Sequence, residues 1–64
     1  KKSIDDITYA IKLSPGNSEW YKFRAAAYIK MKKKQDAIKD LDLSLTLNPN
    51  DEQAKQYRKI AEEM

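Results

Sequence analysis

The feature that most constrains the fold is an internal repeat, in which the segment that ends at Pro15 returns as the segment that ends at Pro49. We call the spacing between these prolines the repeat period. A period of about 34 residues is typical of repeat proteins, in which one unit is stabilised by stacking on the next. The residues that match when the chain is shifted by one period are Ile4 and Ile38, Asp6 and Asp40, Ile7 and Leu41, Ile11 and Leu45, Leu13 and Leu47, and Pro15 and Pro49.

The spacing of apolar residues predicts an all-α fold of four helices. Two amphipathic segments stop at "LSPGN" and "NPN", where proline interrupts a helix. Asn17 or Ser18 is suited to cap the helix after the first proline, and Asn50 or Asp51 the helix after the second. The predicted helices cover about residues 2–13, 18–31, 35–47 and 51–63.

The segment "MKKKQD", residues 31–36, leaves two interpretations open. It must reverse the chain if residues 18–31 and 35–47 form separate helices, yet it contains neither glycine nor proline. Its residues 32–35 are all acceptable helix formers. The alternative is therefore one continuous helix over residues 18–47.

The middle of the chain resembles the tetratricopeptide repeat, a helix–turn–helix unit of about 34 residues. Arg24 stands where the signature of that family has leucine, and Lys32 stands at the usual glycine of the turn. The resemblance implies a single antiparallel solenoid domain, residues 1–64. Its parts would be the second helix of a preceding repeat at residues 1–17, a full repeat at 18–51 and a C-terminal capping helix at 52–64. The signature positions that fit are Tyr21, Ala25, Tyr28, Ala37, Leu41 and Pro49.

The resemblance also implies a structural core. Ala25 and Ala37 are small because two helices of a hairpin approach closely there, and larger side chains fill the space alongside. The core residues expected in this way are Tyr21, Ala25, Tyr28, Ala37, Leu41, Leu45 and Pro49.

Proteins that this chain resembles bind other proteins and are not enzymes. Their first helices line a concave groove that receives an extended peptide or a helix. By position, the groove residues of this chain would be Glu19, Lys22, Phe23, Ala26, Ile29 and Lys30. We expect the two lysines of this set to attract acidic groups of a partner, and Phe23 and Ile29 to supply apolar contact.

The string "RAAAY", residues 24–28, is similar to repeats of chaperone-binding adaptors, which implies a chaperone-related partner. In those repeats a clamp of lysine, asparagine and arginine holds the carboxyl terminus of a heat-shock protein through charge-assisted hydrogen bonds. Here the equivalent positions hold Phe23 and Glu19, so a clamp of this kind would have to come from other repeats. Because the chain begins with Lys1 rather than methionine, we expect it to be part of a longer array.

Composition excludes several classes of function. A chain of 64 residues is too small for a roomy enclosed active site, and it contains neither histidine nor cysteine. The acidic pairs Asp5 with Asp6 and Asp40 with Asp42 fall on polar helix faces, so we expect no catalytic residue, no metal and no cofactor. No apolar run approaches a membrane span or a signal peptide, and we expect a cytoplasmic protein without membrane contact.

Two alternative functions follow from charge and from apolar exposure. The net charge is +3, and Lys30, Lys32, Lys33 and Lys34 form a basic cluster that suits nucleic acid. Nearby aspartates weaken the positive field of this cluster, so we favour the interpretation that it is a solvated turn. An apolar stripe along residues 4–11 would be uncovered if a partner helix is missing, which predicts homo-association. In that case the segment would serve as a purely structural cap of a solenoid.

Overall fold

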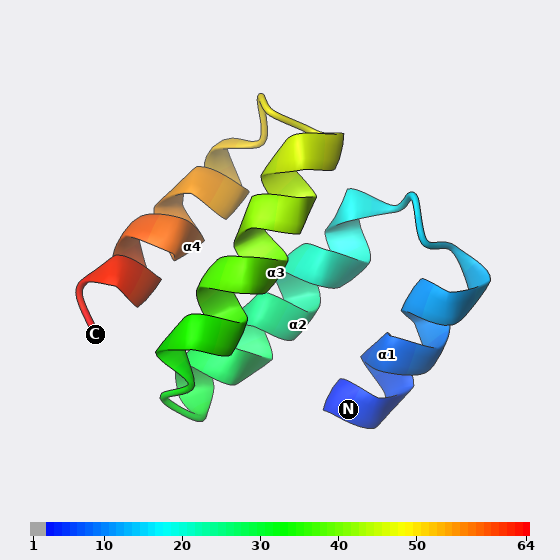
Figure 1. Ribbon diagram of the computed structural model, residues 1–64, viewed down its shortest axis with the longest axis horizontal. Coiled ribbons are helices and arrows are strands. Elements are labelled where there is room, and N and C mark those ends of the chain that lie inside the picture. Colours follow the sequence, from blue (N-terminus) through cyan, green and yellow to red (C-terminus); the bar gives the residue numbers. More distant parts are fainter. Residues whose placement is uncertain (1–2) are drawn as a thin grey trace.

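The computed structural model describes residues 3–64 and shows an all-α fold, so the predicted fold class is confirmed. Its helices are α1 (Ile4–Leu13), α2 (Ser18–Lys30), α3 (Lys34–Leu47) and α4 (Glu52–Glu62). They pack as a row in which each helix runs antiparallel to the next, with α1 and α4 at the two ends (Figure 1). The predicted helix start at residue 2 lies outside the described residues. None of the helices that residues 3–64 form has the length and the apolar composition of a membrane span.

The loops before α2 and α4 use the same capping chemistry. The side chain of Asn17 accepts a hydrogen bond from the backbone N–H of Glu19 at 3.0 Å. Asp51 stands one repeat period after Asn17 and accepts from the N–H groups of Gln53 at 3.0 Å and Ala54 at 3.3 Å. Such caps satisfy N–H groups that have no partner within the helix. The internal repeat therefore extends to the loops as well as to the helices.

Residues 31–33 turn the chain between α2 and α3, so a continuous helix over residues 18–47 is wrong. Lys32 adopts a φ of 59°, in the left-handed region, and the N–H of Lys33 bonds the carbonyl of Tyr28 at 2.9 Å. This conformation costs a residue with a side chain about 1–2 kcal/mol, which is why glycine is common at such turns. Helix propensity did not predict this turn, because the packing of α3 on α2 fixes the position of the turn.

Replacing Lys32 with glycine is expected to raise the free energy of unfolding by about 0.5–1 kcal/mol, because glycine adopts this φ without strain but gains freedom in the unfolded chain. Urea denaturation measures the change. Lys33, with a φ of −99°, is the matched control, and its change to glycine should lower the free energy of unfolding. Equal shifts for both variants would contradict the assignment of strain to Lys32.

The core lies where α2 and α3 cross and where α4 packs against them. Ala25, Ala37 and Leu41 are fully buried there, and Tyr28 and Leu45 pack against them while remaining partly accessible. Small residues let the helix axes approach, so that the side chain of Leu41 fills the remaining space. The alanines of α4, Ala54 and Ala61, are buried in the same cluster.

Two of the expected core residues lie at the edge of this core. Tyr21 is partly buried, and its hydroxyl donates a hydrogen bond of 3.1 Å to the carbonyl of Pro15, which fixes the loop before α2. Pro49 is exposed in the loop between α3 and α4. It differs from the expected core position because its part in the fold is to prevent α3 from continuing, which needs no burial.

Arg24 replaces the leucine of the repeat signature and joins three helices. Its guanidinium donates two hydrogen bonds to the Asp40 carboxylate of α3, at 2.7 and 2.9 Å, and a third to the Thr8 hydroxyl of α1 at 3.1 Å. Asp40 is only 3% exposed, and its hydrogen bond raises the pKa of Arg24. A charged side chain is tolerated at this apolar position because its donors are matched by acceptors.

Candidate functional site

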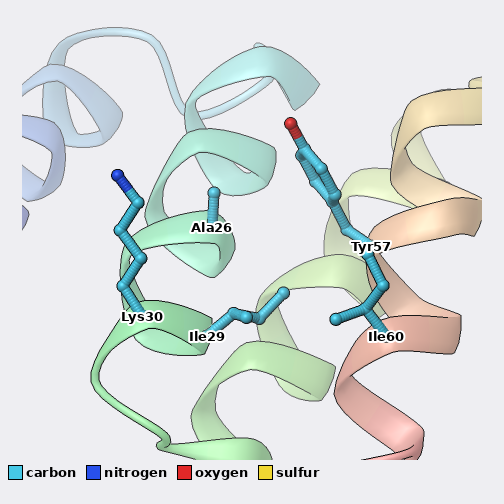
Figure 2. A pocket seen from close by; sticks show the side chains of 5 residues that line it. All are labelled: Ala26, Ile29, Lys30, Tyr57 and Ile60. Carbon is cyan, nitrogen blue, oxygen red and sulfur yellow. The ribbon is translucent and has the colours of Figure 1, made fainter.

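A shallow groove lies between α2 and α4 (Figure 2). Ala26, Ile29 and Lys30 line it from α2, and Tyr57 and Ile60 line it from α4. The side chains of Ile29 and Ile60 point toward each other across the groove (Figure 2). Its volume is about 210 Å³, it opens to solvent, and its lining is almost wholly apolar.

A second hollow of about 420 Å³ adjoins the first, because Ile29 lines both. Lys32 and Met64 also line it, so it reaches the α2–α3 turn and the last residue of the chain. Together the two hollows form an apolar surface with Lys30 and Lys32 at its margin. Neither lysine has an ion-pair partner among residues 3–64, so their positive charge is available to a ligand.

Three of the six residues expected to face the groove line it, namely Ala26, Ile29 and Lys30. Lys22 requires a correction, because it is only 4% exposed and its ammonium is used inside the molecule. Its Nζ lies 3.0 Å from Asp51 Oδ2 and 3.1 Å from Gln53 Oε1. A buried cation needs such partners, so Lys22 is not open to the acidic groups of a partner.

The Lys22–Asp51 pair links α2 to the first turn of α4. Burial by itself lowers the pKa of Lys22, but the hydrogen bond and charge of Asp51, with Glu19 at 3.4 Å, outweigh it and raise that pKa. The hydrogen bond from Lys22 in turn lowers the pKa of Asp51. Both groups are therefore charged at neutral pH, and their pair holds together the two helices that form the groove.

Glu19 and Phe23, also expected in the groove, are exposed on α2 but do not line either hollow. The Phe23 ring packs edge-on against Trp20, with 5.9 Å between ring centroids. Glu19 points its carboxylate to Lys22. The structure thus places these two residues on the first turns of α2, whereas the hollows lie along its last turns.

The groove residues of α4 were missed because the sequence assigned that helix only a capping role. Tyr57, Ile60 and Met64 contribute to the two hollows from the C-terminal part of the chain. A shift by one repeat period would have found them, since it relates each to a residue expected in the groove. The pairs are Phe23 and Tyr57, Ala26 and Ile60, and Lys30 and Met64.

Comparison with known proteins finds similarity to a short segment of longer proteins. No protein-family model and no solved structure matches the chain. Among curated proteins, Hsc70-interacting protein 1 and Hsc70-interacting protein 2 of Drosophila melanogaster are each 43% identical to it over 47 residues. The match covers 73% of this chain but 12% of each relative. The chain therefore corresponds to one short segment of much longer proteins.

Proposed function

We propose that this chain is a protein-interaction module of the tetratricopeptide type, which binds a peptide or helix of a partner in the groove between α2 and α4. The observation that supports this proposal is the open apolar groove in which Ile29 and Ile60 face each other (Figure 2). Apolar side chains that converge on an open groove suit an amphipathic helix, which inserts its own apolar face. The module acts by binding and not by catalysis.

The lysines at the margin of the groove favour a partner with acidic residues beside its apolar ones. Lys30 and Lys32 can form charge-assisted hydrogen bonds with carboxylates that reach past Ile29. We propose a cytoplasmic chaperone of the Hsc70 kind as the partner, and the names of the matched relatives support that choice. Acidic side chains of the chaperone are the groups complementary to Lys30 and Lys32.

The proposed arrangement within a repeat array assigns residues 1–17 to a preceding repeat, 18–51 to one full repeat and 52–64 to a cap. The charge distribution of α4 supports the cap. Where α2 has two partly buried tyrosines and a buried alanine, the equivalent positions of α4 are exposed and carry charge. The pairs are Tyr21 and Lys55, Ala25 and Lys59, and Tyr28 and Glu62. Capping and binding are compatible, because the groove uses the opposite, apolar side chains of α4.

Changing Ile60 to aspartate is expected to weaken binding to purified Hsc70 at least tenfold, because a carboxylate would be buried in the apolar groove. Ile60 is 48% exposed in the free chain, so the fold should tolerate the change. Calorimetric titration measures the affinity, and circular dichroism checks the fold.

Leu43→Asp is the matched control, since Leu43 is an exposed residue of α3 that lines neither hollow. Its affinity for Hsc70 should equal that of the unaltered chain. Equal affinity of the Ile60→Asp variant would reject the groove as the binding site. Failure of the unaltered chain to bind would reject Hsc70 as the partner.

A further inference from the structure

The basic cluster of Lys30, Lys32, Lys33 and Lys34 lies at the turn between α2 and α3. None of these lysines has an ion-pair partner among residues 3–64. Lys34 is half-buried, and the other three are exposed. The positive charge of the cluster is therefore not used to hold the described part of the chain together.

The aspartates that follow the basic cluster in the sequence weaken its field less than their number suggests. Asp40 is only 3% exposed, and its carboxylate accepts hydrogen bonds of 2.7 and 2.9 Å from Arg24. Asp42 lies 2.7 Å from Nε of Arg58. An arginine thus compensates each of these two charges. Asp36 alone of the three aspartates has no ion-pair partner among the described residues, so the cluster keeps most of its positive field.

Lys32 occupies the strained position of the turn. Its φ of 59° lies in the left-handed region, which glycine adopts without strain. A side chain that is kept in such a conformation at a cost in stability points to a function for that side chain. The side chain of Lys32 supplies an exposed ammonium group, which forms no ion pair within residues 3–64. The charge at this position is therefore a property that the fold does not require.

An exposed apolar side chain lies within the basic cluster. Met31 ends α2 and is 53% exposed, with Lys30 and Lys32 on either side of it in the sequence. The turn lies at one end of the row of helices, at the lower edge of the molecule in Figure 1. An apolar side chain among lysines suits an anionic membrane surface, because it can enter the layer of lipid head groups while the long lysine side chains keep their ammonium groups at the phosphates.

We propose that the basic cluster, together with Met31, binds the surface of a membrane that contains anionic phospholipids. Met31 enters the interfacial layer, and the lysine ammonium groups form charge-assisted hydrogen bonds with lipid phosphates. Each lysine close to such a surface raises the affinity about fivefold. The expectation of no membrane contact rested on the absence of a spanning segment, whereas a contact at the membrane surface needs none. This function is separate from the binding of a protein in the groove and does not depend on it.

Acidic residues of other helices confine the contact to the turn. The start of α1, with the exposed Asp5 and Asp6, lies at the same end of the row as the turn (Figure 1). Glu63 is exposed at the end of α4. Anionic lipids repel these carboxylates, so the chain meets the membrane with the turn and not with the whole end of the row. We therefore expect a reversible contact that weakens as the salt concentration rises.

Nucleic acid is a poorer ligand for the basic cluster than an anionic membrane. Residues 30–34 contain no arginine, whose guanidinium binds phosphates and base edges through two parallel hydrogen bonds. They also contain no aromatic side chain on which a base could stack. The exposed Met31 would have no part in such a complex, whereas a membrane surface gives it one.

The test measures co-sedimentation of the full chain with lipid vesicles at low salt. We expect the chain to bind vesicles of phosphatidylserine and phosphatidylcholine, and not vesicles of phosphatidylcholine alone. The double change Lys33→Gln/Lys34→Gln should weaken binding roughly twentyfold, because two lysines are lost. Met31→Ser should weaken binding about threefold or more, because an apolar side chain no longer enters the interface. Circular dichroism checks that each variant keeps its fold.

Lys12→Gln/Lys39→Gln is the matched control. It removes the same charge from two exposed lysines outside the turn, neither of which has an ion-pair partner among residues 3–64. The affinity of this control for the vesicles should stay within about twofold of that of the unaltered chain.

Three outcomes would overturn the proposal. The first is absence of binding to the phosphatidylserine vesicles, and the second is equal weakening by the two double variants, which would mean that net charge alone attracts the chain. The third is binding of a DNA oligonucleotide that needs Lys33 and Lys34 but not Met31, which would identify nucleic acid as the ligand. These three residues line neither hollow, so each outcome leaves the function proposed for the groove unaffected.

Discussion

Replacing Arg24 with leucine, the residue that the repeat signature has at this position, is expected to lower the free energy of unfolding by about 2–4 kcal/mol. The change leaves the Asp40 carboxylate, 3% exposed, without the two donors that bind it. A domain of this size is stable by only about 3–10 kcal/mol, so the variant should be largely unfolded at modest urea concentrations. Urea denaturation followed by circular dichroism measures the loss.

The double variant Arg24→Leu/Asp40→Ala distinguishes a lost ion pair from lost packing. Because it removes the uncompensated charge together with its partner, we expect it to be more stable than Arg24→Leu alone. Arg58→Leu is the matched control at the equivalent position, one repeat period later. Its partner Asp42 is solvent-exposed, so we expect little change. A double variant less stable than the single one would contradict this account of Arg24.

This contact shows why one departure from the repeat signature could be identified but not interpreted from the sequence. Arg24 was visible as a misfit, and nothing local indicated its partner. Asp40 was assigned to a polar helix face, although it lies 16 residues away and is buried. A charged residue in an apolar stripe becomes acceptable only through such a tertiary contact, which periodicity does not encode.

The helices themselves could be predicted closely. The interpretation rests on apolar spacing, two prolines and capping residues, and the helix ends in the described chain lie within two residues of the expected ones. Each of these signals acts within a few residues of the sequence, so it can be recognised without knowledge of the fold. The turn at Lys32 differs because its left-handed backbone is imposed by the helices that it joins.

Only part of the candidate site could be predicted, because only part of it depends on local spacing along one helix. The side of α2 that carries Ala26, Ile29 and Lys30 follows from helical spacing, and these residues line the groove. The opposite wall is supplied by α4, whose approach to α2 depends on the angles between three helices. Lys22 shows the limit most clearly, since its burial requires Asp51, which is 29 residues away in the sequence.

Changing Asp51 to asparagine is expected to lower the free energy of unfolding by about 1–3 kcal/mol at pH 7. Asparagine keeps an acceptor for the first N–H groups of α4, so the cap remains. The charge that compensates the buried ammonium of Lys22 is lost, and only Gln53 and the more distant Glu19 remain near it. The groove should loosen as a result, because this pair joins α2 to α4.

The pH dependence identifies the ion pair as the cause. Because folding lowers the pKa of Asp51, its contribution is present above the ordinary carboxyl pKa of about 4 and disappears as the pH falls through the lower folded value. The difference between the unaltered chain and Asp51→Asn should therefore shrink as the pH falls below about 4, and it should vanish once Asp51 is protonated in the folded chain as well. Lys22 stays protonated throughout this acid range, so the change with pH comes from the titration of Asp51.

Urea denaturation at intervals from pH 7 to pH 2 measures this difference, and Asn17→Ala supplies the control. Asn17 caps α2 as Asp51 caps α4, but it carries no charge, so its loss should lower stability by about 1 kcal/mol at every pH. A parallel, pH-independent deficit for Asp51→Asn would mean that Asp51 acts only as a cap. Apolar packing alone would then hold α4 against α2.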